Sequence, residues 1–395
     1  MNYASITERL AGLAGAKWEI HARARAMASA GQPILSLTIG EPDVPPPPEL
    51  LEAASAAMLK GRTGYSNGRG EPMLLAALSE RYSRRTGRCI GKDQVICLPG
   101  TQTALYATLM ALVETGDEVL VGDPMYATYE GVIVATGARM VAVPLRADHG
   151  FRMQAADVAS RITSKSRVLF LNTPHNPTGA VLDHDDILAL GRIAKAHDLW
   201  ILCDEVYEEL VFAGSTFASP LDGTEFAERT IVVSSISKSH AAPGFRSGWC
   251  VGPGGFTERL LPFAETMLFG NQPFIADMTT LAVSRPSSVA PGMTLRFAAR
   301  AALVHNLLNH RNDLHVHQPQ AGMFVVVDIS ATGLTGEAFS RRLLDEELVA
   351  VMPGESFGAG LHGWLRLSLT RPDAEIAEAC RRIAALTDRL MGDMR

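Results

Sequence analysis

Apolar runs of three to seven residues alternate with longer amphipathic stretches through the first two thirds of the chain. The runs are rich in Val, Ile and Leu and end at Gly, Pro, Asn, Asp or Ser, so they predict strands buried on both faces. The predicted strands are 34–40, 95–98, 118–122, 140–143, 167–171, 199–203, 231–233 and 249–251, and the predicted helices are about 3–30, 48–60, 73–84, 101–113, 132–135 and 183–197. Because these strands alternate with helices, we predict an α/β fold whose large doubly wound domain has a mostly parallel central sheet.

From about residue 281 the pattern changes to a long helix followed by strands and helices in mixed order. Its predicted helices are 293–314, 336–346 and 373–391, and its predicted strands are 322–329, 349–354 and 364–369. We expect the N-terminal segment to join this smaller α+β domain, because the chain enters and leaves the large domain nearby. The proline-rich stretch 41–48 is the expected connector. The predicted domains are therefore 49–284 (large) and 1–48 with 285–395 (small).

Polar or glycine-rich groups follow five of the predicted strands directly. Open α/β sheets bind ligands outside the carboxyl ends of their strands, so we expect these groups to converge on one crevice. They are P-G-T-Q (99–102), D-P-M-Y (123–126), N-T-P-H-N-P-T-G (172–179), D-E-V-Y (204–207) and S-S-I-S-K (234–238).

Lys238 stands between two apolar runs, with Ser235 and Ser237 before it and Arg246 eight positions later. A buried lysine has a lowered pKa and can be the neutral amine that attacks a carbonyl. The hydroxyls and the guanidinium suit a phosphate. Pyridoxal phosphate, a phosphorylated aldehyde, needs both features. The alternative is a solvated loop lysine, and the other parts of the predicted crevice decide between the two.

Thr101 and Gln102 open a predicted helix directly after a strand, where free backbone N–H groups suit either a phosphate or an ordinary helix cap. Asp204 ends an apolar run, so its carboxylate needs a cation. A pyridinium nitrogen would serve, as would a structural salt bridge. Arg366 lies within the apolar strand W-L-R-L-S-L, and no protein carboxylate is evident nearby in the sequence. A substrate carboxylate is therefore its expected partner.

Composition and charge exclude several classes of function. The net charge is −6 and no basic run occurs, which argues against a nucleic-acid partner. No apolar run approaches the ~20 residues of a membrane helix, and no signal peptide is visible. The five cysteines are scattered without a C-x-x-C pair, so we expect reduced thiols, no metal site and a cytoplasmic protein.

In combination and in this order, these motifs resemble those of class I and II aminotransferases of the fold-type I pyridoxal-phosphate family. The resemblance spans nearly the whole chain. It implies that Lys238 binds the cofactor as a Schiff base and moves the substrate proton, and that Asp204 pairs with the pyridinium nitrogen. It also implies that Asn176 and Tyr207 bind the ring oxygen and that Tyr126 stacks on the ring.

The same resemblance assigns the remaining contacts. The implied phosphate ligands are Thr101, Gln102, Ser235, Ser237 and Arg246. Gly40, Asn176 and Arg366 would hold the substrate α-carboxylate. Tyr65 would reach the phosphate of a neighbouring subunit, which implies a homodimer with shared active sites. Thr101 and Phe245 depart from the residues most common in the family, and neither departure removes a needed group.

The implied reaction is ping-pong transfer of an α-amino group from an amino acid to a 2-oxo acid such as pyruvate. Stretch 267–277 contains no Arg or Lys, which argues against a strict preference for dicarboxylates. W-E-I-H (18–21), H-D-L-W (197–200), S-K-S-H-A (237–241) and G-M-F-V-V-V-D-I (322–329) resemble arginine–pyruvate transaminases. Trp18 and Glu19 are candidates to line a site for an arginine side chain, but an amphipathic helix face is the favoured explanation of both residues.

Two other classes of function remain open. A β-lyase or a decarboxylase could use the same site, because the choice of reaction depends on which bond at the α-carbon is aligned with the ring. A non-catalytic ligand sensor with an aminotransferase-like core would carry an added DNA-binding segment, which the sequence does not suggest. A nicotinamide site has little support, because no G-x-G-x-x-G follows a strand.

Overall fold

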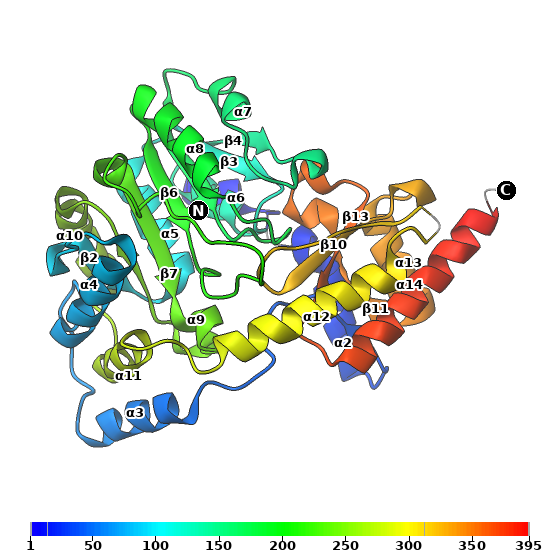
Figure 1. Cartoon of the computed structure of the whole chain (residues 1–395), viewed down its shortest axis with the longest axis horizontal. Coiled ribbons are helices and arrows are strands. Elements are labelled where there is room, and N and C mark those ends of the chain that lie inside the picture. Colours follow the sequence, from blue (N-terminus) through cyan, green and yellow to red (C-terminus); the bar gives the residue numbers. More distant parts are fainter. Residues whose placement is uncertain (1, 14, 312, 394–395) are drawn as a thin grey trace.

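The computed structural model describes residues 2–13, 15–311 and 313–393 and divides them between two lobes (Figure 1). The larger lobe contains a seven-stranded sheet of order β2-β8-β7-β6-β5-β3-β4. These strands are β2 (Val95–Leu98), β3 (Glu118–Asp123), β4 (Arg139–Pro144), β5 (Ser166–Asn172), β6 (Trp200–Asp204), β7 (Thr230–Ser235) and β8 (Gly248–Val251). Only β8 runs against its two neighbours in this sheet, so the predicted doubly wound domain with a mostly parallel sheet is confirmed.

Helices surround this sheet and extend the larger lobe. They are α3 (Pro48–Leu59), α4 (Pro72–Thr86), α5 (Gly100–Leu112), α6 (Tyr129–Ala135), α7 (Ala155–Ala159), α8 (His184–Ala196), α9 (Ile236–Ser239), α10 (Gly254–Leu268) and α11 (Pro273–Val283). Local sequence explains several of their ends. Pro48 occupies the first turn of α3, where its missing N–H costs nothing, and the Asp183 side chain caps α8 by accepting from the Asp186 N–H.

The smaller lobe has a four-stranded antiparallel sheet and a two-stranded parallel one. The strands are β1 (Leu35–Ser36), β9 (His315–His317), β10 (Phe324–Asp328), β11 (Val349–Ala350), β12 (Met352–Pro353) and β13 (Trp364–Ser368). The helices are α2 (Glu19–Ser29), α12 (Ala290–Leu308), α13 (Gly336–Glu347) and α14 (Asp373–Asp393), whereas α1 (Ser5–Leu10) packs on α6 of the larger lobe. In Figure 1, α12 runs from the foot of the larger lobe along the smaller one, beside α14.

The N-terminal segment joins the C-terminal part of the chain, because β1 pairs in parallel with β11. This strand is shorter than the predicted 34–40. The Leu37 N–H still donates to the Ala350 carbonyl, but beyond it the carbonyl groups of Thr38 and Gly40 accept hydrogen bonds from side chains. The two sheets lie inside the two predicted domains, whose boundaries remain a prediction.

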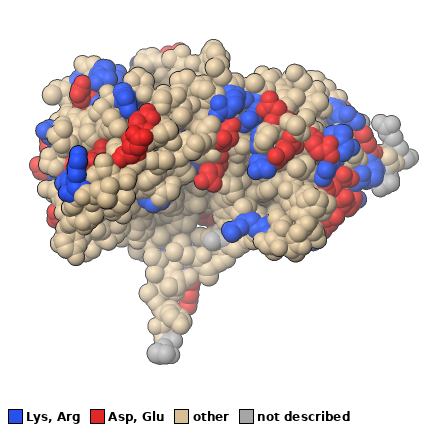
Figure 2. Space-filling view, turned by 90° about the horizontal axis from the view of Figure 1, so that it is seen from below, with Lys and Arg blue, Asp and Glu red and all other residues tan. Residues whose placement is uncertain are grey.

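Charged side chains of both signs are spread over the molecular surface in Figure 2. On the face drawn in Figure 2, Lys and Arg are interspersed with Asp and Glu, so that face has no broad basic patch. Within the described ranges, no helix is long and apolar enough to cross a membrane. The same ranges contain no group of three or more His, Cys, Asp or Glu side chains arranged to hold a metal ion.

Candidate active site

The topology brings five strand ends to one edge of the large sheet. Strands β2, β3, β5, β6 and β7 run in the same direction, and the antiparallel β8 begins at the edge where they end. A pocket of about 200 Å³ lies there. Thirteen of the predicted site residues line it, namely Trp18, Gly40, Thr101, Gln102, Tyr126, Asn176, Asp204, Tyr207, Ser235, Ser237, Lys238, Arg246 and Arg366.

Lys238 lies in the short helix α9, which begins directly where β7 ends. Its Nζ donates a hydrogen bond to the Gly40 carbonyl oxygen at 2.8 Å. Burial lowers the pKa of this amine to about 8, although the Glu41 carboxylate opposes the shift. A substantial fraction of the amine is therefore neutral near physiological pH, which is the nucleophilic form.

Asp204 ends β6 with only 3% of its surface exposed. Its two carboxylate oxygens accept hydrogen bonds from the Tyr129 hydroxyl at 2.7 Å and from the Val206 N–H at 3.1 Å. Burial raises the pKa of Asp204 to about 6, against the effect of these bonds and of Lys238. Each oxygen retains a further lone pair, so the carboxylate can still accept from a cationic N–H group.

The start of α5 brings together groups that could bind an anion. Thr101 and Gln102 are in its first helical turn, whose backbone N–H groups have no side-chain cap. The Thr101 hydroxyl donates to Ser235 Oγ at 3.0 Å, which places the β7 end beside this turn. Gly100 has φ +82°, and a Cβ at that position would overlap the Arg246 guanidinium. Glycine therefore allows the guanidinium to lie against the helix start, and the combination suits a phosphate.

Arg366 is one of the largest fully buried side chains of the molecule, with 2% of its surface exposed. Its Cζ lies 3.9 Å from the ring centre of Phe324 and 4.4 Å from that of Phe357. The guanidinium donates to Asn176 Oδ1 at 3.2 Å and to the Thr38 carbonyl at 2.5 Å. Burial lowers its pKa to about 10.

The part of the chain that the structure describes offers no carboxylate partner to Arg366, and its Nε has no hydrogen-bond acceptor there. A buried cation without a counter-ion is costly. A planar carboxylate from a substrate would satisfy it.

The aromatic residues predicted around a ring are also brought together. Asn176 is buried, lines the pocket together with Tyr207, and accepts a hydrogen bond from Arg366. Burial raises the pKa of Tyr126 and Tyr207, so both hydroxyls stay protonated and can donate hydrogen bonds. Tyr126 is half-buried on the pocket wall, in edge-to-face contact with Tyr129 at 5.6 Å.

Three residues considered for the rim differ in their placement. Trp18 is half-buried and lines the pocket. Glu19 points elsewhere, because its carboxylate accepts from the Arg341 guanidinium at 3.0 and 3.2 Å on the surface, so the amphipathic-face interpretation holds for Glu19. Tyr65 is 89% exposed beside Phe269 and does not reach this pocket.

Sequence reasoning missed several residues of the site. Tyr129, Phe324 and Ile39 line the pocket, and Phe357 packs on Arg366. Tyr129 gave no clear signal in the sequence, because it opens α6 and its hydroxyl reaches Asp204 at the end of β6. The others carried no signal either, because distant segments of the chain come together in the fold to place them beside Arg366 and the pocket.

Comparisons with known proteins agree with this geometry. The family model described as aminotransferase class I and II matches residues 32–383. The chain is 43% identical over 392 residues to the arginine–pyruvate transaminase AruH of Pseudomonas aeruginosa, which covers 99% of this chain and 100% of that protein. The aspartate aminotransferase structure from Rhizobium meliloti superposes with a TM-score of 0.93 at 29% identity, covering 98% and 99% of the two chains. The aromatic aminotransferase structure from Pyrococcus horikoshii superposes with a TM-score of 0.87 at 29% identity, covering 93% and 99%.

Proposed function

Because the chain belongs to the class I and II aminotransferase family and is a transaminase, we propose that its amino donor is arginine or another non-acidic L-amino acid and its acceptor a 2-oxo acid such as pyruvate. The composition of the pocket carries this proposal. Among the described residues, its cationic lining side chains are Lys238, Arg246 and Arg366. Lys238 and Arg246 are assigned to the cofactor and Arg366 to the substrate α-carboxylate. The lining therefore offers no cation for a carboxylate on the substrate side chain. Trp18 instead offers an aromatic face to a guanidinium.

Members of this family depend on pyridoxal phosphate, and the residues present fit that group. Lys238 would bind its aldehyde, Asp204 its ring nitrogen, and the Gly100–Gln102 turn with Arg246 its phosphate. The uncapped start of α5 and the remaining lone pairs on Asp204 are the features that support this fit. When bound, the cofactor supplies an electron-withdrawing ring that stabilises negative charge at the substrate α-carbon.

The chain's own residues then have distinct roles. Arg366 and Asn176 would bind and orient the α-carboxylate, while Phe324 and Phe357 keep water from the guanidinium. Lys238 Nζ would take the proton from the α-carbon and later return it, because its lowered pKa allows both steps near neutral pH. We infer that an amino donor and an oxo acceptor use the same groups in turn, as a ping-pong scheme requires.

The proposed assembly is a homodimer with shared active sites. Tyr65 supports it, because this large aromatic side chain is 89% exposed and has no role in its own pocket. We propose that its hydroxyl completes the phosphate site of a second copy. We also propose a cytoplasmic location, since the five cysteines are unpaired, as is usual in reducing compartments.

Substrate choice can be tested with the purified holoenzyme. Arginine, alanine and aspartate are each supplied with pyruvate or 2-oxoglutarate, and the keto acid, new amino acid, ammonia and carbon dioxide are measured. We expect arginine to give equal amounts of its keto acid and alanine from pyruvate. Release of ammonia or carbon dioxide without a new amino acid would instead indicate a lyase or a decarboxylase.

A matched pair of variants tests the role of Trp18. Trp18→Ala should raise KM for arginine by about 2- to 30-fold, the range of a cation–π contact, and change KM for alanine much less. Trp18→Phe keeps an aromatic face and should lie between wild type and the alanine variant. Equal effects on both donors would mean that Trp18 only supports the rim.

A further inference from the structure

Tyr129 forms a direct link to the carboxylate at the base of the active site. It opens α6, is 2% exposed, and donates from its hydroxyl to Asp204 Oδ2 at 2.7 Å. The two residues are 75 positions apart in the sequence. Hydrogen bonds to a charged acceptor are about twice as strong as neutral ones, so this contact favours the ionised carboxylate.

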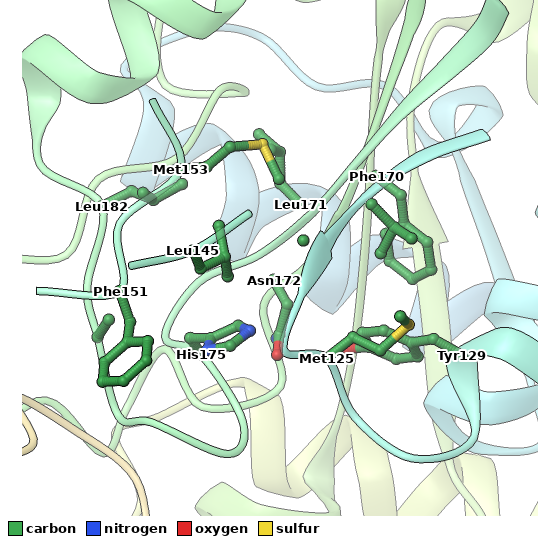
Figure 3. Close-up of a pocket in the computed structure, with 13 residues that line it drawn as sticks. Met125, Tyr129, Leu145, Phe151, Met153, Phe170, Leu171, Asn172, His175 and Leu182 are labelled. Carbon is green, nitrogen blue, oxygen red and sulfur yellow. The ribbon is translucent and has the colours of Figure 1, made fainter. Parts of the chain in front are cut away.

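The surroundings of Tyr129 hold its ring in place from two sides. Phe170 stacks on it with ring centres 4.5 Å apart, and Tyr126 meets it edge-on. Figure 3 shows Tyr129 and Phe170 at one side of a small cavity and His175 at the other, with Asn172 between them. The cavity measures about 20 Å³, room for about one water molecule and too small for a substrate.

Asn172 fixes the backbone of the same strand end. Its Nδ2 donates to the carbonyl oxygens of Asp204 and Pro174, each at 3.1 Å, and its Oδ1 accepts from the Asn176 N–H at 2.9 Å. The backbone of Asp204 is thus held by Asn172, whereas its carboxylate is held by Tyr129. Because Asn172 fixes the backbone, loss of the Tyr129 hydroxyl should change the ionisation of the Asp204 carboxylate without changing the fold of this strand end.

We propose that Tyr129 is a positioning residue that keeps the buried Asp204 carboxylate ionised and aimed at the ring nitrogen of the cofactor. This inference rests on the proposed pyridoxal phosphate site. The other titratable groups that act on these two side chains are Lys238, Tyr126 and Tyr207. Of these only Lys238 favours the ionised form of Asp204 electrostatically, and in the holoenzyme that amine would be occupied by the cofactor.

The test compares two tyrosine-to-phenylalanine variants, with cofactor affinity as the readout. Tyr129→Phe removes the hydroxyl that Asp204 accepts from. Tyr82→Phe is the matched control, because the Tyr82 hydroxyl is also fully buried and also takes part in a side-chain hydrogen bond, from Trp249 Nε1 at 2.8 Å. Affinity of the apoenzyme for pyridoxal phosphate is measured from pH 5.5 to 8.5, and kcat and KM are measured on the holoenzyme.

For Tyr129→Phe we expect cofactor affinity to fall by about tenfold or more, since a hydrogen bond to a charged group is lost. The loss should be greatest at low pH, because Asp204 then needs a higher pH to ionise. The kcat should fall while KM for the amino donor stays within about twofold, since Arg366 is untouched. Tyr82→Phe should leave all of these values near those of wild type.

A second variant covers the case in which Tyr129→Phe does not fold. Replacement of Tyr129 by 3,5-difluorotyrosine keeps the shape and makes the hydroxyl a stronger donor, so cofactor binding should persist to lower pH than in wild type. If the pH dependence of cofactor affinity were the same in both Tyr129 variants as in Tyr82→Phe, the proposed role of Tyr129 would be overturned. The proposed cofactor site would not be affected by that result. A wild-type protein that binds no pyridoxal phosphate would overturn both.

Discussion

The Lys238 Nζ and the Gly40 carbonyl oxygen are 2.8 Å apart although 198 residues separate them in the sequence. Lys238 belongs to the large domain, and Gly40 lies in the N-terminal segment that continues from β1. The proposed catalytic amine is thus held by a backbone group of the other lobe. Arg366 makes a parallel contact with the Thr38 carbonyl at 2.5 Å, so the segment 38–40 touches both the amine and the proposed carboxylate-binding guanidinium.

The close approach of Gly40 predicts a strong effect of a small substitution. In Gly40→Ala the new Cβ would overlap the Phe324 ring, which packs on Arg366. We expect kcat/KM to fall by at least about tenfold, since the ring or the segment must shift. Gly392→Ala is the control, because a Cβ there meets no atom within 4 Å. Wild-type kinetics in Gly40→Ala would show that the segment adapts freely.

The lowered pKa of Lys238 predicts a pH dependence of cofactor attachment. The neutral amine attacks the aldehyde, so the rate at which apoenzyme binds pyridoxal phosphate covalently should rise with a midpoint near pH 8. A free lysine side chain would instead require a pH near 10.4. Stopped-flow absorbance measures the rate, with N-acetyl-lysine as the reference amine. A midpoint above pH 10 in the enzyme would contradict the assignment.

The same shift has a consequence for stability. Because the folded pKa of Lys238 lies below the unfolded value, the unfolded chain binds this proton more readily between about pH 8 and 10.5. The unfolding free energy of the apoenzyme should therefore rise with pH across this window relative to Lys238→Met, which has no amine to titrate. If the stabilities of the two proteins, measured by thermal unfolding, changed with pH in the same way, burial would not have lowered the pKa of the amine.

Removal of the Arg366 guanidinium should weaken every amino acid and oxo acid alike. Its proposed contact with the α-carboxylate is common to all substrates, and two charged hydrogen bonds are worth about 3–6 kcal/mol together. We expect Arg366→Ala to raise KM by about 100-fold or more for each donor. Arg371→Ala, which removes an exposed partner of Glu375, serves as the control. An effect confined to one class of substrate would mean that Arg366 binds a side chain.

A buried ion network behind Asp204 predicts a large loss of stability. Glu205 is completely buried and accepts from Arg85 at 2.8 Å, and Arg85 also pairs with Glu208 at 2.6 Å. Arg85→Met should destabilise the fold by about 3–5 kcal/mol, because it leaves buried carboxylates without their cation. The neighbouring exposed pair of Arg84 with Glu80 is the comparison, since Arg84→Met should cost less than about 1 kcal/mol. Equal losses of unfolding free energy in Arg85→Met and Arg84→Met, measured by chemical denaturation, would refute the role of burial.

Much of the large domain could be predicted because its strands are continuous apolar runs. The polar groups that follow these runs mark the edge where the strands end, which is why Asp204, Asn176 and Lys238 were found from sequence. Helices α10 and α11 were not assigned. Pro262 lies inside α10, and an internal proline normally argues against a helix.

The contacts that depend on assembly could not be predicted. Phe324 and Phe357 enclose Arg366 only because β10 pairs with β13 and the turn around Phe357 folds back on the same arginine. The bond from Tyr129 to Asp204 likewise joins separate elements. Spacing along a chain predicts contacts within one helix. It does not predict which distant strands pair or which loops fold back on them, and these contacts depend on both.

The most direct test of the account is the absorbance spectrum of the purified holoenzyme during titration with arginine, compared with Lys238→Ala. We predict a visible band that moves to shorter wavelength as arginine is added, with one equivalent of keto acid per active site, and alanine on addition of pyruvate. Lys238→Ala should remain folded and show neither the shift nor turnover. A wild-type protein without a visible band after incubation with pyridoxal phosphate, or substantial turnover by Lys238→Ala, would contradict the account.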